Sequence, residues 1–191
     1  MKALVLRQHG GLEQLEVVAD HPRPAVTEGH VVIRVRASSF NYHDVFTVRG
    51  MPGIKVPLPV VIGLDMAGEI VEVGANVTGW QAGDRVLVNP LNKKKGLMGE
   101  MLDGGMAEYL ALPETHLFKA EGISLDEMAM VEFLAIGAHA VARARIQKGQ
   151  RALVVGAGSI GVGVSIFAQL QGAEVTVIDG RADRLAFATE K

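Results

Sequence analysis

Short apolar runs separated by glycine, proline and aspartate fill the first 122 residues of the chain. Such runs are typical of β-strands, and the segment HVVIRVRAS alternates as a half-buried strand does, with one face formed by Val31, Ile33 and Val35 and the other by Val32, Arg34 and Arg36. Many short strands at this spacing favour a small antiparallel barrel. The strands are expected at residues 2–6, 12–18, 30–38, 68–73 and 85–89.

The pattern changes after residue 122. Ser124 is followed three residues later by Glu127, which is the S-x-x-E arrangement of a helix capping box, and the helix should extend to about Arg145. The expected organisation is therefore a barrel domain over residues 1–123, a linking helix over 124–148, and a second domain over 149–191.

The second domain opens with an apolar, β-branched run at residues 152–155, typical of a buried parallel strand. Gly156, Gly158 and Gly161 follow with G-x-G-x-x-G spacing, and the apolar residues 160–170 have the length of a helix. A second apolar strand is expected at residues 175–178, directly before Asp179. Strand, glycine turn, helix and strand together predict a βαβ unit.

The chemistry of this unit indicates a dinucleotide site. Gly156 permits the sharp turn, Gly158 lets the backbone approach a pyrophosphate, and Gly161 allows the helix to pack close to the strand. The N–H groups of Ser159 and Ile160, at the helix N-terminus, would face the phosphates. The alternative is that the glycines merely serve a strand-to-helix turn.

Asp179 lies 21 residues after Gly158, where a carboxylate can accept hydrogen bonds from an adenosine ribose and repel a 2′-phosphate. This favours NAD(H) over NADP(H). Arg181 and Arg184 follow closely and could instead attract a 2′-phosphate, whereas Arg184 could equally be a solvated helix residue or stack on adenine.

A doubly wound sheet has six strands, and only two are present before the sequence ends in a probable helix at residues 183–191. Each further strand and helix takes roughly 25 to 30 residues, so on the order of 100 residues are missing from such a domain. We therefore expect a truncated chain.

Bulk properties exclude several classes of protein. A net charge of −2 gives no basic footprint for nucleic acid, and Lys93 to Lys95 form a cluster typical of a solvated loop. The chain has no cysteine, which excludes disulfides and cysteine-ligated zinc. No run approaches 18 apolar residues and no signal peptide is visible, so a soluble cytoplasmic protein without membrane contact is expected.

Several stretches resemble one known family. They are MKALVL at the start, PVVIGLDMAGEIVEVG at 59–74, GDRV at 83–86, GGMAEY at 104–109 and VVGAGSIGVG at 154–163. In this order the chain resembles the medium-chain dehydrogenase/reductase superfamily. The resemblance implies a mixed α/β and β fold, with a GroES-like antiparallel β-barrel followed by the first part of a Rossmann doubly wound parallel sheet. It also implies hydride transfer between a nicotinamide and a carbonyl, alcohol or activated alkene.

The resemblance also bears on zinc. Zinc alcohol dehydrogenases carry Cys-His-x-Asp where this chain has 41–44, NYHD, and Gly-His-Glu where it has 63–65, GLD. Asp65 and Glu132 alone make a poor zinc site, since catalytic zinc needs about three protein ligands. The four-cysteine structural lobe is replaced by residues 91–103. We therefore expect no zinc, as in the quinone oxidoreductase and enoyl reductase branch.

Without a metal, an oxyanion or enolate must be met by hydrogen-bond donors. Asn41 and Tyr42 are the candidate donors, His43 is a candidate general acid, and Asp65 completes the predicted catalytic set. In the structural interpretation, Asn41 and Asp44 fix a loop through backbone bonds, His43 is exposed, and Asp65 is a turn or ion-pair carboxylate.

The remaining notable side chains have structural interpretations. Glu132 and His139 share a helix face, where His139 is expected to pack with a satisfied hydrogen bond. Trp80 is expected to pack at the barrel edge. The other histidines are interpreted as structural or solvent-facing; they are His9, His21, His30 and His116.

The predicted function is zinc-independent, NAD(P)(H)-dependent reduction of a small-molecule carbonyl, quinone or activated alkene in a cleft between the two domains. The look-alike proteins suggest a homo-oligomer, a dimer or tetramer, if a full-length chain exists. Two alternatives remain open. An alcohol or polyol dehydrogenase, with or without catalytic zinc, is favoured by the context of Glu132 and by the run 137–140, GAHA. A truncated, non-catalytic binding module is the other.

Overall fold

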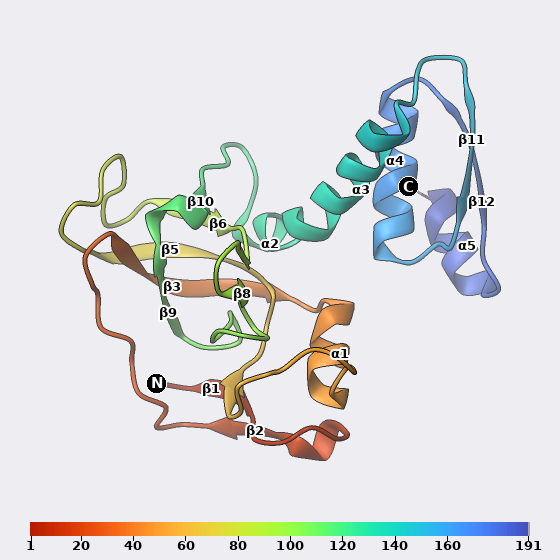
Figure 1. Cartoon of the computed structure of the whole chain (residues 1–191). Helices are drawn as coiled ribbons and strands as arrows, with labels where there is room; N and C mark the ends of the chain where they lie inside the picture. Colours follow the sequence, from red (N-terminus) through yellow and green to blue (C-terminus); the bar gives the residue numbers. More distant parts are fainter. Residues whose placement is uncertain (191) are drawn as a thin grey trace. The chain divides into compact units, whose positions relative to one another are not determined.

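A computed structural model describes residues 1–190 (Figure 1). The chain divides into two compact units, one from Met1 to Met130 and one that begins at Val131. Each unit is described by itself below. The first is built mainly of antiparallel strands and the second of alternating strands and helices, so the predicted mixed fold class is confirmed.

A curled sheet with the strand order β10-β6-β5-β3-β9 forms the centre of the first unit, and every neighbouring pair in it is antiparallel (Figure 1). Its core is a cluster of ten buried apolar side chains that includes Ile33, Met66 and Leu112. Trp80 packs against this cluster, as expected for the barrel edge. The strands are β3 (His30–Ser39), β5 (Asp65–Val73), β6 (Arg85–Val88), β9 (Tyr109–Pro113) and β10 (Leu117–Phe118).

Strand β3 differs from the half-buried strand that its alternation predicts. Val31, Val32 and Ile33 are all fully buried, and polar alternation begins only at Arg34. The strand is central in the sheet, between β5 and β9, and two register shifts interrupt its pairing with β5. Its first half therefore has no solvent-facing side.

A smaller sheet, in the order β2-β1-β4, consists of β1 (Ala3–Leu6), β2 (Leu15–Val18) and β4 (Val60–Val61). The prediction of one strand over 12–18 is wrong at its start, where residues Leu12–Gln14 form a 3₁₀ turn, η1. The N–H of Gln14 donates to the carbonyl of Gly11, and the N–H of Gly11 donates to Glu13. These local bonds replace strand pairing and leave Leu12 exposed.

Helix α1 (Tyr42–Arg49) interrupts the strands of the first unit and was not predicted. Its N-terminus is a capping box, with Asn41 as N-cap and Asp44 at the third position, and Gly50 ends it in a left-handed conformation. The pattern N-x-x-D was the sequence signal for this helix. Further along, β7 (Leu91–Asn92) and β8 (Gly96–Leu97) form a short hairpin.

The segment expected to be one helix contains two, α2 (Leu125–Ala129) and α3 (Val131–Ala144), separated at Met130. The Ser124 capping box is confirmed, because the Ser124 hydroxyl accepts from the Glu127 N–H and Glu127 accepts from the Ser124 N–H. Helix α2 belongs to the first unit, where Met128 packs in a cluster with Ala67. Helix α3 begins the second unit.

The second unit contains the predicted βαβ arrangement. Strands β11 (Arg151–Val155) and β12 (Glu174–Ile178) are parallel, and α4 (Ser159–Leu170) connects them. Helices α3 and α4 approach closely at Gly137, where an added Cβ would lie 2.7 Å from the backbone carbon of Gly163. Helix α5 (Ala182–Glu190) occupies the predicted helix at 183–191, except that Lys191 lies outside the described residues.

Membrane insertion of a helix finds no support in the part of the chain that the structure describes, since none of its helices combines sufficient length with sufficient apolar character to cross a bilayer.

Candidate active site and dinucleotide loop

Three polar side chains meet where β3 ends and β5 begins. Ser39 and Asp65 are directly opposite each other in the ladder, and the Ser39 hydroxyl donates to Asp65 Oδ2 at 2.9 Å. The Asn41 amide donates to both carboxylate oxygens of Asp65 at 3.2 Å. Asp65 is completely buried, so these donors stabilise a carboxylate that water cannot reach.

Asn41 connects this carboxylate to helix α1. Its Oδ1 accepts from the His43 N–H at 3.0 Å, and its own backbone N–H donates to Asp44 Oδ2 at 2.9 Å. The capping bonds required by the structural interpretation are therefore present. The same amide also binds Asp65, which makes Asn41 the link between the helix start and the buried carboxylate.

Asp44 is a second buried carboxylate in this cluster, with 1% of its surface exposed. Burial raises the pKa of Asp44 to about 6; the N–H of Asn41 opposes this change, and the charge of Asp65 adds to it. Its Oδ1 makes no hydrogen bond of ordinary geometry, and the N–H groups of Gly63 and Leu64 offset the cost of burial only in part. At neutral pH the Asp44 carboxylate is therefore a charged group with little access to water.

Tyr42 and His43 are the more accessible members of the predicted set. Tyr42 is 65% exposed, and its ring contacts Phe46 edge-on at a centroid distance of 5.0 Å. The His43 side chain is 40% exposed, and its Nδ1 lies 3.2 Å from Glu100 Oε2. Both residues lie in the first turn of α1, so the helix start presents a phenol and an imidazole side by side in sequence.

Glu100 was missed by the sequence analysis; it is 2% exposed, and its Oε2 lies within hydrogen-bond distance of His43 Nδ1. It lies 57 residues from His43 in the chain, in the segment that follows the β7–β8 hairpin. The preceding Gly99 has a φ of +78°, and an added Cβ would lie 2.6 Å from the carbonyl oxygen of Gly63. Only glycine allows this backbone contact, which brings Glu100 to the site.

The donor set does not suit a zinc ion. Within residues 1–190 no group of three His, Cys, Asp or Glu side chains is arranged to hold a metal ion. The amide of Asn41 directs its N–H donors at Asp65, and Leu64 is a buried apolar side chain. An amide nitrogen is not a zinc ligand, so Asn41 as oriented here does not fit a zinc ion.

The glycine turn between β11 and α4 has the geometry that its spacing predicts. Gly156 has a φ of +103°, and a Cβ on Gly161 would lie only 1.8 Å from the Gly156 carbonyl oxygen. Gly158 differs from both, because its φ is −75° and an added Cβ would meet no atom within 4 Å. The fold itself thus needs Gly156 and Gly161, whereas Gly158 leaves open space in front of the helix.

That open space fits a dinucleotide phosphate. The N-cap position of α4 is Gly158, which has no side chain to satisfy the first-turn amides, including those of Ser159 and Ile160. Among the described residues, no neighbouring atom requires glycine at position 158. A glycine at this position, beside backbone N–H groups that no capping side chain accepts from, allows an anion to approach the backbone closely. The residues present therefore fit a pyrophosphate.

Asp179 closes the turn on its other side. Its Oδ2 accepts from the Ala157 N–H at 2.7 Å and its Oδ1 from the Arg181 N–H at 2.8 Å, and these bonds hold the pKa of Asp179 below its ordinary value. The Arg181 guanidinium is bound to Asp183, while Arg184 Nη1 lies 3.8 Å from Asp179. These bonds favour the ionised form of Asp179. Of the two arginines, Arg184 is the one whose guanidinium forms an ion pair with Asp179.

The other candidate side chains lie on α3 and in the loops of the first unit. Glu132 and His139 are both on α3, and His139 is exposed, so the expectation that it packs is not met. His116 is buried, with its Nδ1 2.8 Å from the Asn89 carbonyl oxygen, and is structural as expected. The His9 ring likewise contacts the Thr47 carbonyl oxygen.

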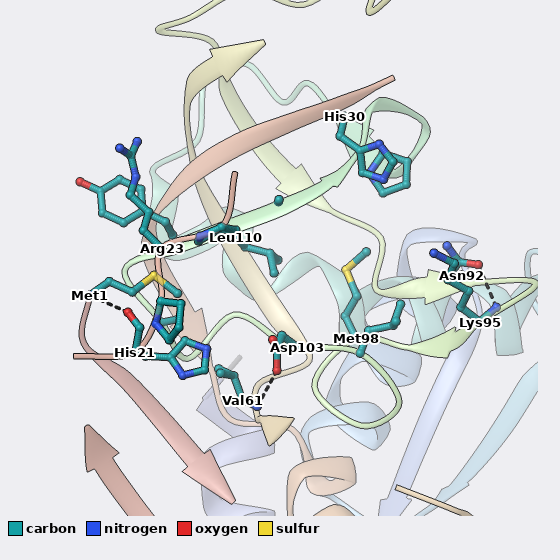
Figure 2. A pocket seen from close by; sticks show the side chains of 18 residues that line it. Met1, His21, Arg23, His30, Val61, Asn92, Lys95, Met98, Asp103 and Leu110 are labelled. Carbon is teal, nitrogen blue, oxygen red and sulfur yellow. Dashed lines mark hydrogen bonds between the residues drawn. The ribbon is translucent and has the colours of Figure 1, made fainter. Parts of the chain in front are cut away.

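A cavity of about 480 Å³ in the first unit contains none of the predicted catalytic residues (Figure 2). Two of its charged side chains are engaged in the fold: Asp103 accepts from the Val61 N–H at 2.9 Å, and the Arg23 guanidinium lies 4.5 Å from the Tyr109 ring centre and pairs with Glu72. We therefore place the candidate chemistry at the start of α1.

Comparisons with known proteins identify the family. Residues 27–122 match the model of the alcohol dehydrogenase GroES-like domain, which covers half of the chain. The chain belongs to this family, within the medium-chain dehydrogenase/reductase superfamily. The resemblance stated from the sequence is thereby confirmed.

Two curated members of the family illustrate its range. Sorbitol dehydrogenase of Halalkalibacterium halodurans is 33% identical over 93% of this chain and 56% of its own length. Acryloyl-coenzyme A reductase of Metallosphaera sedula is 33% identical over 92% of this chain and 57% of its own length. A solved NAD-dependent alcohol dehydrogenase superposes with a TM-score of 0.90 at 32% identity, over 100% of this chain and 61% of that protein. The chain thus spans a little over half the length of these relatives.

Proposed function

We propose that this chain belongs to a zinc-independent, NAD(H)-dependent oxidoreductase that reduces a small-molecule carbonyl, quinone or activated alkene. The observation that carries the proposal is the hydrogen-bonded cluster of Ser39, Asn41 and Asp65. Asn41 stands where the resemblance places a cysteine ligand of zinc, and its amide donates to Asp65 instead. The family and its named dehydrogenases and reductases support an oxidoreductase.

The second unit would supply the cofactor site. A bound nicotinamide dinucleotide supplies the hydride in such a reaction. The turn at Gly158 leaves room for its pyrophosphate, the amides of Ser159 and Ile160 would donate to the phosphate oxygens, and the fixed charge of Asp179 favours a ribose hydroxyl over a 2′-phosphate.

The first unit would supply hydrogen-bond donors for the substrate oxygen. The exposed Tyr42 phenol and the half-exposed His43 imidazole are the donors that a substrate can reach. Asn41 and Asp65 would hold the start of α1 in place, because the N–H groups of the Asn41 amide donate to the Asp65 carboxylate. Charge that develops on the substrate oxygen is then stabilised by preorganised donors and neutralised by a proton from His43.

Reduction of an activated alkene has specific support among the relatives. The Metallosphaera protein is named for acryloyl-coenzyme A, whose double bond is conjugated to a thioester carbonyl. Hydride addition to such an alkene produces an enolate, which likewise needs hydrogen-bond donors to its oxygen and a proton.

An alcohol or polyol dehydrogenase is the second candidate function. It is supported by the similarity to sorbitol dehydrogenase and to the solved NAD-dependent alcohol dehydrogenase. Glu132 stands where the polyol branch keeps a carboxylate ligand, so a metal-dependent member of that branch is the form that this alternative takes.

Metal content and substrate class separate the two candidates. The purified chain is assayed for NADH oxidation with quinones, enones and acyl thioesters, and for NAD⁺ reduction with polyols, before and after chelation. The first proposal predicts no stoichiometric zinc and a reductase activity that resists the chelator. One tightly held zinc per chain, with polyol oxidation lost on chelation, establishes the second candidate instead. Complete absence of NADH affinity would leave a non-catalytic binding module.

The assembly and location of the protein remain predictions. We propose a homo-oligomer, a dimer or tetramer, in the cytoplasm, acting on a small molecule without a nucleic-acid partner.

A further inference from the structure

We infer that Glu100 is a positioning residue for His43. Glu100 fixes the tautomer and orientation of the imidazole, so that Nε2 is the ring nitrogen available to the substrate. The inference rests on the proposed function in one respect, namely that His43 transfers the proton. The pair itself rests on the structure alone.

The first step is the burial of Glu100. Its side chain is 3% exposed, and a carboxylate removed from water needs a charged or hydrogen-bonding partner. The partner is the His43 imidazole, with Nδ1 at 3.2 Å from Oε2. The pair therefore brings a buried acceptor to a ring that is itself 40% exposed.

The second step concerns the proton on the ring. An ionised carboxylate can only accept hydrogen bonds, so Nδ1 must be the donor. A neutral His43 then carries its proton on Nδ1 and a lone pair on Nε2, and a charged His43 carries a transferable proton on Nε2. Among the described residues Nε2 has no hydrogen-bond partner, so it is the nitrogen that a substrate can engage.

The third step is orientation. His43 is in the first turn of α1, and the Thr47 hydroxyl donates to its carbonyl oxygen at 3.0 Å, which ties its backbone to the helix. The ring contacts Phe46 edge-on, at a centroid distance of 5.8 Å. Helix, Phe46 and Glu100 thus restrain the ring from three sides, which is the preorganisation that a general acid needs.

The test begins with nitrogen chemical shifts of the histidines, which distinguish the two neutral tautomers. Spectra of the whole chain are recorded at a pH where the imidazoles are neutral, for the wild type, Glu100→Met and Glu100→Gln. Methionine matches the length of glutamate but offers no strong acceptor, and glutamine retains a carbonyl oxygen. His43 should carry its proton on Nδ1 in the wild type, shift toward the Nε2-protonated form in Glu100→Met, and be intermediate in Glu100→Gln.

Three other histidines are internal controls in the same spectra. The Nδ1 atoms of His9, His30 and His116 lie 2.8 to 2.9 Å from backbone carbonyl oxygens, which only accept. Their tautomers should not depend on Glu100. A His43 tautomer that is the same in all variants, while these controls remain in place, would overturn the inference.

Activity provides the second measurement. Loss of positioning should lower kcat by about 10- to 100-fold, at most the lower end of the 10² to 10⁴ that a general acid contributes, and should leave the KM for NADH unchanged. Glu100→Gln should recover part of kcat. A changed tautomer with unchanged kcat would refute the catalytic half of the inference.

The proposed function can fail separately. A wild-type chain without NADH-dependent activity contradicts the function, yet the histidine spectra still decide whether Glu100 sets the tautomer. Unfolding of Glu100→Met is recognised by loss of the control histidine signals, and Glu100→Gln, which is close in shape to the native side chain, then decides the question.

Discussion

Asp44→Asn should change the pH dependence of stability. The native carboxylate has its pKa raised from 3.8 to about 6, so the folded state binds a proton more tightly than the unfolded state does. The stability contributed by this group is then greatest at low pH and falls as the pH rises from about 4 to 6. Asparagine removes this titration, while its side-chain oxygen can still accept from the Asn41 N–H.

The magnitude follows from the size of the pKa change. Since one pKa unit corresponds to about 1.4 kcal/mol, ionised Asp44 costs about 3 kcal/mol of stability at neutral pH relative to an unperturbed aspartate. Between pH 7 and pH 5 the native chain should recover about 1.3 kcal/mol of this relative to Asp44→Asn.

The assay is urea unfolding followed by tryptophan fluorescence at pH 5, 6 and 7. Trp80 is the only tryptophan of the chain and packs on the core of the first unit. Asp44 lies in the same unit. The difference between the two proteins removes the contribution of the other carboxylates, which is common to both. The reasoning is refuted if the free energy of unfolding of the two proteins changes with pH in parallel, or if the native chain loses stability toward pH 5 relative to Asp44→Asn. Either result would show that burial of ionised Asp44 does not destabilise the protein as calculated.

Four further substitutions test the second unit and the helix cap. Gly158→Ala should leave unfolding within about 0.5 kcal/mol but weaken NADH binding about tenfold or more, as loss of a hydrogen bond to a charged group would; unchanged affinity measured by titration would remove the phosphate from this turn. Gly137→Ala should destabilise by about 1 to 3 kcal/mol, because its Cβ would meet the α4 backbone at 2.7 Å. The matched Gly163→Ala has only ordinary contacts at 3.5 Å and should be neutral or stabilising in thermal unfolding; equal effects would contradict the close approach. Ser124→Ala should cost about 1 kcal/mol in Trp80-monitored unfolding, and no loss would mean that the capping box is not stabilising.

The order of strand, glycine turn, helix and strand in the second unit was predicted from sequence because its signals are local, whereas the burial expected of its first strand is not found, since Leu153 and Val155 are exposed. The turn residues Gly156, Gly158 and Gly161 follow one another within six positions, and apolar runs of the correct length lie on both sides. The same holds for the Ser124 cap, whose partner is three residues away. In such motifs the residues that contact one another are also close in the sequence.

The first unit was predicted less completely, for two physical reasons. Strand β4 has only two residues, too few for an alternating pattern to be visible. Helix α1 has no apolar stripe, because its buried residues include Asp44 and Thr47. Patterns of hydrophobicity cannot report a helix whose inner side is polar.

The candidate site was predicted only in part. Asn41, Tyr42 and His43 are consecutive, so one motif draws attention to all of them, and Asp65 is found through its own motif. Glu100 has no such signal, because its relation to His43 arises from the approach of two distant backbones at Gly63 and Gly99. A long-range contact of this kind is visible only in three dimensions.

The Ser39 hydroxyl has two acceptors within reach, Asp65 Oδ2 at 2.9 Å and the carbonyl oxygen of Ala129, the last residue of α2, at 3.1 Å. One hydroxyl hydrogen cannot serve both fully, and an ionised carboxylate is the stronger competitor. The bond to Asp65 is therefore expected to be the stronger of the two, and the bond to the end of α2 the weaker. A single hydroxyl group thus connects the buried cluster to the residue next to Met130, where the first compact unit ends.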